Sequence, residues 1–179
     1  SCFFGFGGVF FENDAVEKTV RMGLYEQGML PGVVMSPTCF VQEVSDKRPR
    51  TRAAEHIMSQ VMIKPGMSVP GNMYFTTTKL HQEIAGGVFC DVIVDEAHDP
   101  QNPFPWKGNI SIEKLDAELK RAGEGNIAYI SFEMSVNLAG GQPFSMENVR
   151  EVSAWCQKHN VPLMFDATRC IENARMVQM

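Results

Sequence analysis

Val161-Pro-Leu-Met-Phe-Asp166-Ala-Thr-Arg169 is a short apolar run that ends in an acid and then a base. This pattern is typical of a buried strand in an α/β sheet, which delivers charged side chains at its carboxyl end, where such sheets bind ligands. An acid there requires a cationic partner or several hydrogen-bond donors. Arg169 is one candidate partner for Asp166 and a ligand cation is the other. The segment therefore predicts either an ion pair that orders a loop or part of a binding site.

The residues before this run alternate between strand and helix patterns. Helices are expected over 53–63, from Thr76-Thr-Thr78 to Gly86, from Ser111 to Gly123 and from Ser145 to Cys156, with these threonines, Ser111 and Ser145 as N-caps. Strands are expected at 68–70, 88–94, 127–132 and 161–166. This alternation predicts an α/β segment over 52–170 with a mainly parallel sheet and flanking helices. The carboxyl ends of its strands meet at one edge, which would collect Phe75-Thr76, Asn137 and the turn from Asp166 to Arg169.

The composition indicates one globular domain, because the 179 residues are 44% hydrophobic and 21% charged. A net charge of −5 argues against a nucleic-acid partner. The aromatic start, 1–11, has no basic flank and is too short to span a bilayer, so it predicts an apolar loop and no membrane anchor. Cysteines without a C-x-x-C pair predict reduced thiols in a cytoplasmic protein and no zinc framework.

Several polar or aromatic positions allow two interpretations. Arg52 stands at a helix start, where it either binds an anion or is solvated. Phe75 either stacks on a planar ligand or fills the core. Asp95-Glu-Ala-His98-Asp99 contains metal-ligand side chains, but its histidine is single, so a solvated loop is favoured over a metal site. Residues 1–50 are irregular apart from a possible helix over 12–26.

Longer motifs resemble one family, the aromatic amino-acid β-eliminating lyases of the tyrosine phenol-lyase and tryptophanase type. They are Arg52-Ala-Ala-Glu55, Lys64-Pro-Gly66, Gly71-Asn-Met-Tyr-Phe-Thr-Thr-Thr78, His81-Gln-Glu83, Asp95-Glu-Ala-His-Asp99, Asn137-Leu-Ala-Gly-Gly-Gln-Pro143, and Asp166-Ala-Thr-Arg-Cys170 with Glu172-Asn-Ala174. The resemblance covers 51–174, whereas 1–50 and the tail 175–179 show none. It implies part of the large domain of a fold-type-I enzyme that depends on pyridoxal phosphate.

The resemblance also implies a role for each cofactor-site residue. Phe75 would stack on the pyridine ring, and Asn137 and Arg169 would contact its 3′-oxygen. Asp166 would pair with the protonated ring nitrogen, which keeps the cofactor an electron sink. Arg52 would hold the phosphate, although Arg50-Thr51 precedes it where the family has Gln-Gly. No catalytic residue is expected within the chain, because the family's Schiff-base lysine would lie beyond its end.

The implied activity is cleavage of an aromatic amino acid. Thr76 follows the stacking aromatic as in the family's phenol-lyases, so tyrosine is favoured as substrate, giving phenol, pyruvate and ammonia. Tryptophan, giving indole, is the alternative, and a non-catalytic truncated remnant is another. The fragment alone is expected to be inactive. The family also implies a homotetramer and a potassium ion, for which this sequence offers no identifiable ligands; no other metal is expected.

Overall fold

The computed structural model describes residues 4–6, 9–11, 51–166 and 169–178. At its centre is a six-stranded sheet with the order β1-β2-β6-β5-β3-β4. The strands that run parallel are β3 (Ser68–Gly71), β4 (Val88–Asp91), β5 (Ile130–Glu133) and β6 (Leu163–Asp166). The predicted α/β class with a mainly parallel sheet is therefore confirmed.

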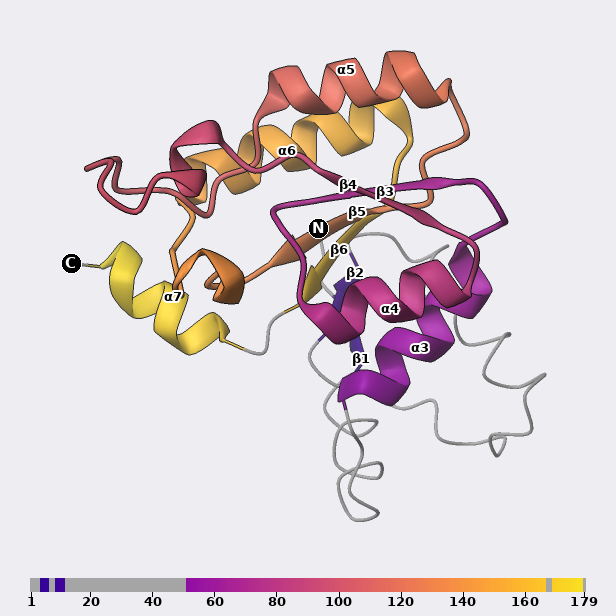
Figure 1. Ribbon diagram of the computed structural model, residues 1–179, viewed down its shortest axis with the longest axis horizontal. Coiled ribbons are helices and arrows are strands. Elements are labelled where there is room, and N and C mark those ends of the chain that lie inside the picture. Colours follow the sequence, from indigo (N-terminus) through magenta and orange to yellow (C-terminus); the bar gives the residue numbers. More distant parts are fainter. Residues whose placement is uncertain (1–3, 7–8, 12–50, 167–168, 179) are drawn as a thin grey trace.

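Helices cover both faces of this sheet. They are α3 (Thr51–Met62), α4 (Thr76–Ile84), α5 (Ile112–Ala122), α6 (Met146–His159) and α7 (Cys170–Val177). Two short 3₁₀ helices, η1 (Asp95–His98) and η2 (Asn137–Ala139), interrupt the loops after β4 and β5. Figure 1 shows α5 and α6 on one face of the sheet and α3 and α4 on the other.

The alternation of side chains along β6 assigns its residues to these two faces. Leu163 and Phe165 pack in the core beneath α5 and α6. Met164 instead packs with Ile57 and Met58 of α3. Because successive side chains of a strand point to opposite faces, Asp166 falls on the face covered by α3 and α4.

The same rule applies to β5. Ile130 and Phe132 belong to the core beneath α5 and α6. Glu133, the next residue, therefore falls on the opposite face. It is also the register partner of Asp166, so the two acids end neighbouring strands side by side.

Two helices begin where the sequence predicts. The Ser111 Oγ accepts a hydrogen bond from the Lys114 N–H at 3.3 Å, and the Ser145 Oγ accepts one from the Asn148 N–H at 3.1 Å. These N-caps satisfy backbone donors that a helix start leaves unpaired. The predicted cap of α4 by its threonines is wrong, because Phe75 occupies the N-cap without a side-chain hydrogen bond and the threonines form the first turn.

An asparagine extends the pairing between β3 and β5. The backbone register joins these strands at Gly71 and Ser131, where a Cβ on Gly71 would stand 2.8 Å from the Ser131 carbonyl oxygen. The fully buried Asn72 follows. Its Oδ1 accepts the Glu133 N–H at 2.7 Å and its Nδ2 donates to the Glu133 carbonyl at 3.0 Å. The side-chain amide thus takes the place of a peptide group in the ladder.

The aromatic start of the chain is a hairpin and not the predicted apolar loop. β1 (Phe4–Phe6) pairs antiparallel with β2 (Val9–Phe11), which pairs antiparallel with β6. The aromatic and β-branched residues there favour strands, and the hairpin covers an edge of β6 whose backbone groups would otherwise lack partners. The possible helix over 12–26 lies outside the described residues.

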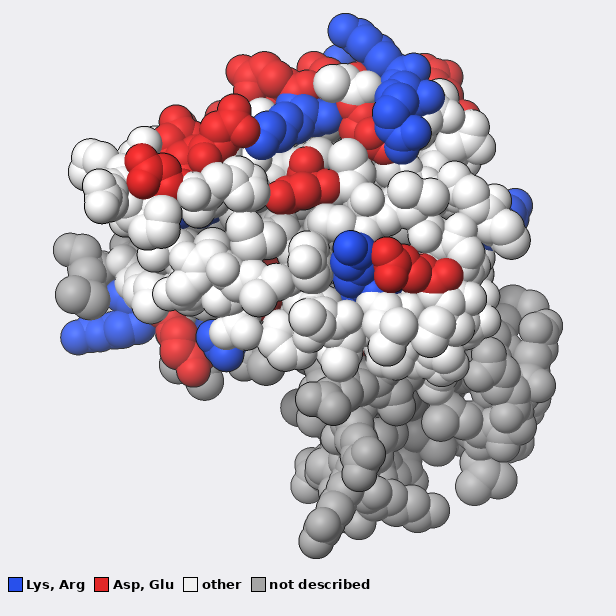
Figure 2. All heavy atoms as spheres, viewed as in Figure 1, with Lys and Arg blue, Asp and Glu red and all other residues white. Residues whose placement is uncertain are grey.

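Charged side chains are distributed in a way that fits the exterior of this fold. Figure 2 shows acidic and basic side chains interspersed over α5, with a Lys–Glu pair on α4. That pair is Lys79 and Glu83, whose charged atoms lie 3.7 Å apart. In the part of the chain that the structure describes, every helix is too short or too polar to cross a membrane.

Candidate functional site

The predicted site residues follow the carboxyl ends of neighbouring parallel strands. Phe75 lies beyond β3 at the N-cap of α4, and Asn137 lies beyond β5 at the start of η2. Asp166 is the last residue of β6, and Arg169 is the N-cap of α7. Parallel strands end at the same edge of a sheet, so the topology gathers these residues there.

Phe75 and Asp166 line one small pocket. The other lining residues are Met73, Tyr74, Thr78, Gln82, Phe89, Ser131 and Glu133. The enclosed volume is about 10 Å³, which is room for roughly one water molecule. The pocket therefore joins the end of β3 and the start of α4 to the ends of β5 and β6.

Glu133 connects the other two predicted residues to this pocket. The Asn137 N–H donates to the Glu133 Oε1 at 3.2 Å. Burial raises the pKa of Glu133 to about 7, the Asn137 bond and the nearby Arg169 charge oppose this rise, and Asp166 adds to it. Asn137 and Arg169 thus influence the same carboxyl group that faces Phe75 and Asp166 across the pocket.

A second buried acid comes from α3. Glu55 is 3% exposed, and burial raises its pKa to about 8, with Asp166 as the next cause. The Asp166 charge adds to this rise, and Glu133 contributes a smaller repulsion. Glu55 therefore shares one electrostatic environment with the two acids at the strand ends.

The remaining predicted residues lie differently. Arg52 is in the first turn of α3, but its side chain is outside the described residues. Thr76 is exposed at the start of α4, next to Phe75 and not among the pocket-lining residues. The structure therefore gives Thr76 a place at the rim and leaves the orientation of Arg52 undescribed.

The acidic segment after β4 has its own partners. Its predicted loop contains η1, in which the Asp95 Oδ1 lies 2.6 Å from the Lys114 Nζ and the His98 Nε2 lies 3.5 Å from the Asp91 Oδ2. Among the described residues, no three His, Cys, Asp or Glu side chains gather as a metal site would require. An open cleft of about 780 Å³ lies beside η1, lined in part by Asp95 and Lys114. Lys114 is already bound to Asp95 and to the Ile93 carbonyl, so this larger cleft presents no free amine.

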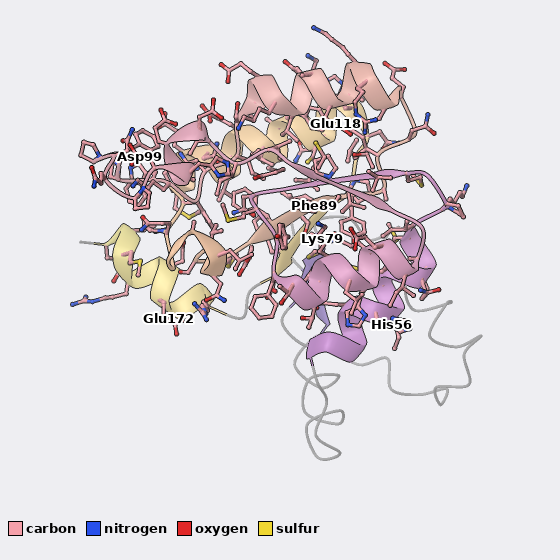
Figure 3. All side chains as sticks on the ribbon, viewed as in Figure 1. His56, Lys79, Phe89, Asp99, Glu118 and Glu172 are labelled. Carbon is pink, nitrogen blue, oxygen red and sulfur yellow. The ribbon has the colours of Figure 1, made fainter. Side chains whose placement is uncertain are left out.

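A second buried cluster lies across the sheet from the pocket. Figure 3 places Glu118 on α5 and His56 on α3, at opposite sides of the sheet. Glu118 accepts hydrogen bonds from Arg121 and Ser68. Burial and the neighbouring Glu118 raise the pKa of Cys90 to about 11, which keeps the thiol protonated and unreactive.

Comparison with known protein families matches the beta-eliminating lyase family over residues 48–179. The chain belongs to the beta-eliminating lyase family. It is 55% identical to the tyrosine phenol-lyase of Pasteurella multocida (strain Pm70) over 127 residues. These residues are 71% of this chain and 28% of that protein. It is 54% identical over the same length to the tyrosine phenol-lyases of Symbiobacterium thermophilum and Nostoc punctiforme, covering 28% and 27% of those proteins. The chain thus spans little more than a quarter of the length of these relatives.

Membership of this lyase family implies dependence on pyridoxal phosphate, and the chemistry at the strand ends suits that cofactor. Asp166 supplies an acid, Phe75 an aromatic ring, Asn137 an amide and Arg169 a guanidinium. The Thr78 Oγ and Glu133 Oε2 are buried without a hydrogen-bond partner among the described residues, so the pocket has polar capacity left. At about 10 Å³ the pocket itself has room for a water molecule and not for a pyridine ring.

Sequence reasoning missed two acids at this edge of the sheet. Glu133 ends β5 as Asp166 ends β6, so its place after a predicted strand was an available signal. Glu55 lies three residues before Met58 and seven before Met62, which puts a carboxyl group on the apolar face of α3. An acid on the buried face of a helix requires a partner or a proton, and that was the signal for Glu55.

Proposed function

We propose that this chain is part of a pyridoxal-phosphate-dependent carbon–carbon lyase that splits tyrosine into phenol, pyruvate and ammonia. The observation that carries the proposal is the meeting of Phe75 and Asp166 at one pocket whose Glu133 also interacts with Asn137 and Arg169. Relatives that are named tyrosine phenol-lyases support the choice of reaction. The family resemblance further supports a homotetramer in the cytoplasm.

Each residue at the strand ends has a proposed role toward the cofactor. When bound, pyridoxal phosphate supplies an electron sink for the bonds at the substrate Cα. The Asp166 carboxylate holds a proton on the ring nitrogen, which strengthens that sink. Phe75 covers one ring face and excludes water from it. Asn137 and Arg169 would donate hydrogen bonds to the ring oxygen and so orient the ring.

Arg52 is proposed to bind the cofactor phosphate. Its backbone lies in the first turn of α3, where N–H groups and the helix dipole favour an anion. A guanidinium adds forked, permanently charged donors to such a site. The phosphate would then anchor the cofactor at α3 while β5 and β6 hold its ring.

Substrate choice is proposed to involve Thr76. Its exposed side chain at the start of α4 stands next to Phe75 in the sequence, so it is placed to meet a group that lies over the ring. The family resemblance, in which phenol-lyases have a threonine at this place, favours tyrosine as substrate, and tryptophan is the alternative.

A chimaera tests this proposal. Residues 52–178 of this chain replace the corresponding part of a complete tyrosine phenol-lyase, and the purified protein is assayed with tyrosine and with tryptophan. We expect phenol release from tyrosine to be faster than indole release from tryptophan. A Thr76→Ala chimaera is the matched control for substrate choice, and an Asp166→Asn chimaera should lose both reactions. Faster indole release, or full activity in Asp166→Asn, would contradict the proposal.

A non-catalytic remnant is the second candidate function. The residues that line the described pocket include no lysine. Lys79 of α4 is the lysine next to that wall, but its amine lies over the Tyr74 ring, 4.6 Å from the centroid, and beside Glu83. These contacts favour a polypeptide that binds cofactor without turning substrate over.

A further inference from the structure

Three acids lie on the face of the sheet under α3 and α4, and the proposed reaction uses only one of them. Glu133 and Asp166 are register partners at the ends of β5 and β6, and both line the pocket. Glu55 of α3 is 3% exposed. It stands three residues before Met58, which packs with Met164 of β6 on the face of the sheet where Asp166 falls. The Glu55 Oε2 is buried without a hydrogen-bond partner among the described residues. Only Asp166 has a proposed role toward the cofactor.

Three neighbouring carboxyl groups in such a site cannot all be ionised. Removing each charge from water is costly, and like charges at close range raise the cost further. Among the side chains that the structure describes, Arg169 is the cation that acts on Glu133, and it is not among the influences on Glu55. The group that keeps its proton is therefore Glu55, which is more deeply buried than Glu133 and has Asp166 as its main charged neighbour.

Histidines on the same helices complete the set of titratable neighbours. His56 of α3 and His81 of α4 form an edge-to-face pair with ring centroids 5.1 Å apart. Neither histidine is among the groups that influence Glu55. The Thr78 hydroxyl of α4 lies near enough to lower the pKa of Glu55, but burial and the Asp166 charge outweigh it, and a hydroxyl supplies no charge. No cation in the described surroundings of Glu55 therefore stabilises its ionised form, and Glu55 keeps its proton.

We propose that Glu55 is a positioning residue for Asp166: the protonated Glu55 carboxyl donates a hydrogen bond to the Asp166 carboxylate and fixes the direction and the charge of that acid. This inference rests on the proposed function, in which Asp166 pairs with the ring nitrogen of the cofactor. A neutral donor behind Asp166 orients it without cancelling its charge, whereas an arginine in the same place would weaken its hold on the ring proton.

The proposal makes distinct demands on substitutions of Glu55. Glutamine is nearly isosteric and its amide can donate to Asp166, so Glu55→Gln should preserve the positioning. Leucine fills similar space without a donor, so Glu55→Leu should release Asp166. Far-ultraviolet circular dichroism confirms that each variant is folded. Where Glu55→Leu does not fold, Glu55→Gln and Asp166→Asn still carry the infrared test.

The first arm of the experiment needs no cofactor. Infrared spectra of the 179-residue chain near neutral pH record the carbonyl stretch of buried protonated carboxyl groups, identified by its shift in heavy water. We expect a band that Glu55→Gln removes and that Asp166→Asn shifts, because Asp166 is the acceptor of its hydrogen bond. Glu133→Gln serves as the control that separates the Glu133 contribution. A spectrum unchanged by Glu55→Gln, or a Glu55 band indifferent to Asp166→Asn, would overturn the proposal.

The second arm measures binding of pyridoxal phosphate by its absorption spectrum, with the pH at which the spectrum changes as a further readout. Losing a hydrogen bond to a charged group should weaken binding by about tenfold in Glu55→Leu, whereas Glu55→Gln stays within about twofold of the wild type. Asp166→Asn reports on the proposed function. If it binds as the wild type does, the cofactor role of Asp166 is wrong. If it binds weakly but Glu55→Leu binds normally with an unchanged spectrum, the role of Glu55 is wrong.

Discussion

At the scale of single residues, burial controls the charge of the acids at the strand ends. Burial is the largest cause that raises the pKa of Glu55 to about 8 and that of Glu133 to about 7, both from 4.5. A folded-state pKa above the unfolded value means that the fold prefers the neutral acid. The stability that each group contributes is fully present below about pH 4.5, the unfolded value. It is lost as the pH rises through the folded value.

The free energy of unfolding should therefore fall between about pH 5 and about pH 9. Each group that titrates contributes a slope of up to about 1.4 kcal/mol per pH unit within its window. Urea denaturation at a series of pH values measures this slope. Glu55→Gln should flatten the profile toward its alkaline end, and the exposed Glu83→Gln should leave it unchanged. A profile that Glu55→Gln does not alter would contradict the assignment of Glu55 as a buried neutral acid.

At the scale of elements, α6 depends on a cap that also joins it to a loop. The Ser145 Oγ accepts the Asn148 N–H at 3.1 Å, and the Ser145 N–H donates to the Asn109 Oδ1 at 2.9 Å. Ser145→Ala removes the first bond and keeps the second. It should lower the free energy of unfolding by about 1 kcal/mol, measured by urea denaturation. Ser145→Thr retains the capping oxygen and should lose less, and equal losses in both variants would show that the cap is not what Ser145 provides.

The elements that could be predicted from the sequence are those with local signals. α5 and α6 begin at Ser111 and Ser145 and end at Gly123 and Asn160, whose φ angles of 85° and 52° suit a helix end. Hydrophobic spacing and helix caps depend on residues only a few positions apart, so they can be recognised in a single sequence. The cap of α4 was missed because Phe75, which has no capping side chain, holds that position.

The hairpin and the acid cluster depend on contacts between distant segments. β2 is a strand because it pairs with β6, and Val9 is opposite Asp166 across more than 150 residues. Glu55 is likewise far from Asp166 in the sequence, and only the packing of α3 on the sheet brings them together. The resemblance to the family motifs identified Phe75, Asn137, Asp166 and Arg169. It does not predict which other acids pack beside them. Local patterns alone could not predict such an arrangement.

At the scale of the whole molecule, the described pocket offers cofactor contacts without an amine to capture the cofactor. We expect the purified 179-residue chain to release no pyruvate from tyrosine or tryptophan and to form no borohydride-trappable adduct with pyridoxal phosphate in stoichiometric yield. A coupled pyruvate assay and mass spectrometry of the reduced chain provide the measurements. Lys79→Ala is the control, because Lys79 lies against Tyr74 at the pocket wall. Turnover that Lys79→Ala abolishes would assign the missing amine to Lys79.

The Asn72 rung between β3 and β5 has a consequence for the time scale on which this end of the sheet opens. The Glu133 amide donates to a side chain, whereas the Ile130 amide of the same strand donates to the Pro162 carbonyl. A side chain can leave by rotation about its own bonds, but a backbone partner leaves only when strands separate. In amide hydrogen exchange, Glu133 should therefore show a smaller opening free energy than Ile130. The strand ends that carry the acids would then open transiently while the hydrogen bonds at the centre of the sheet stay intact.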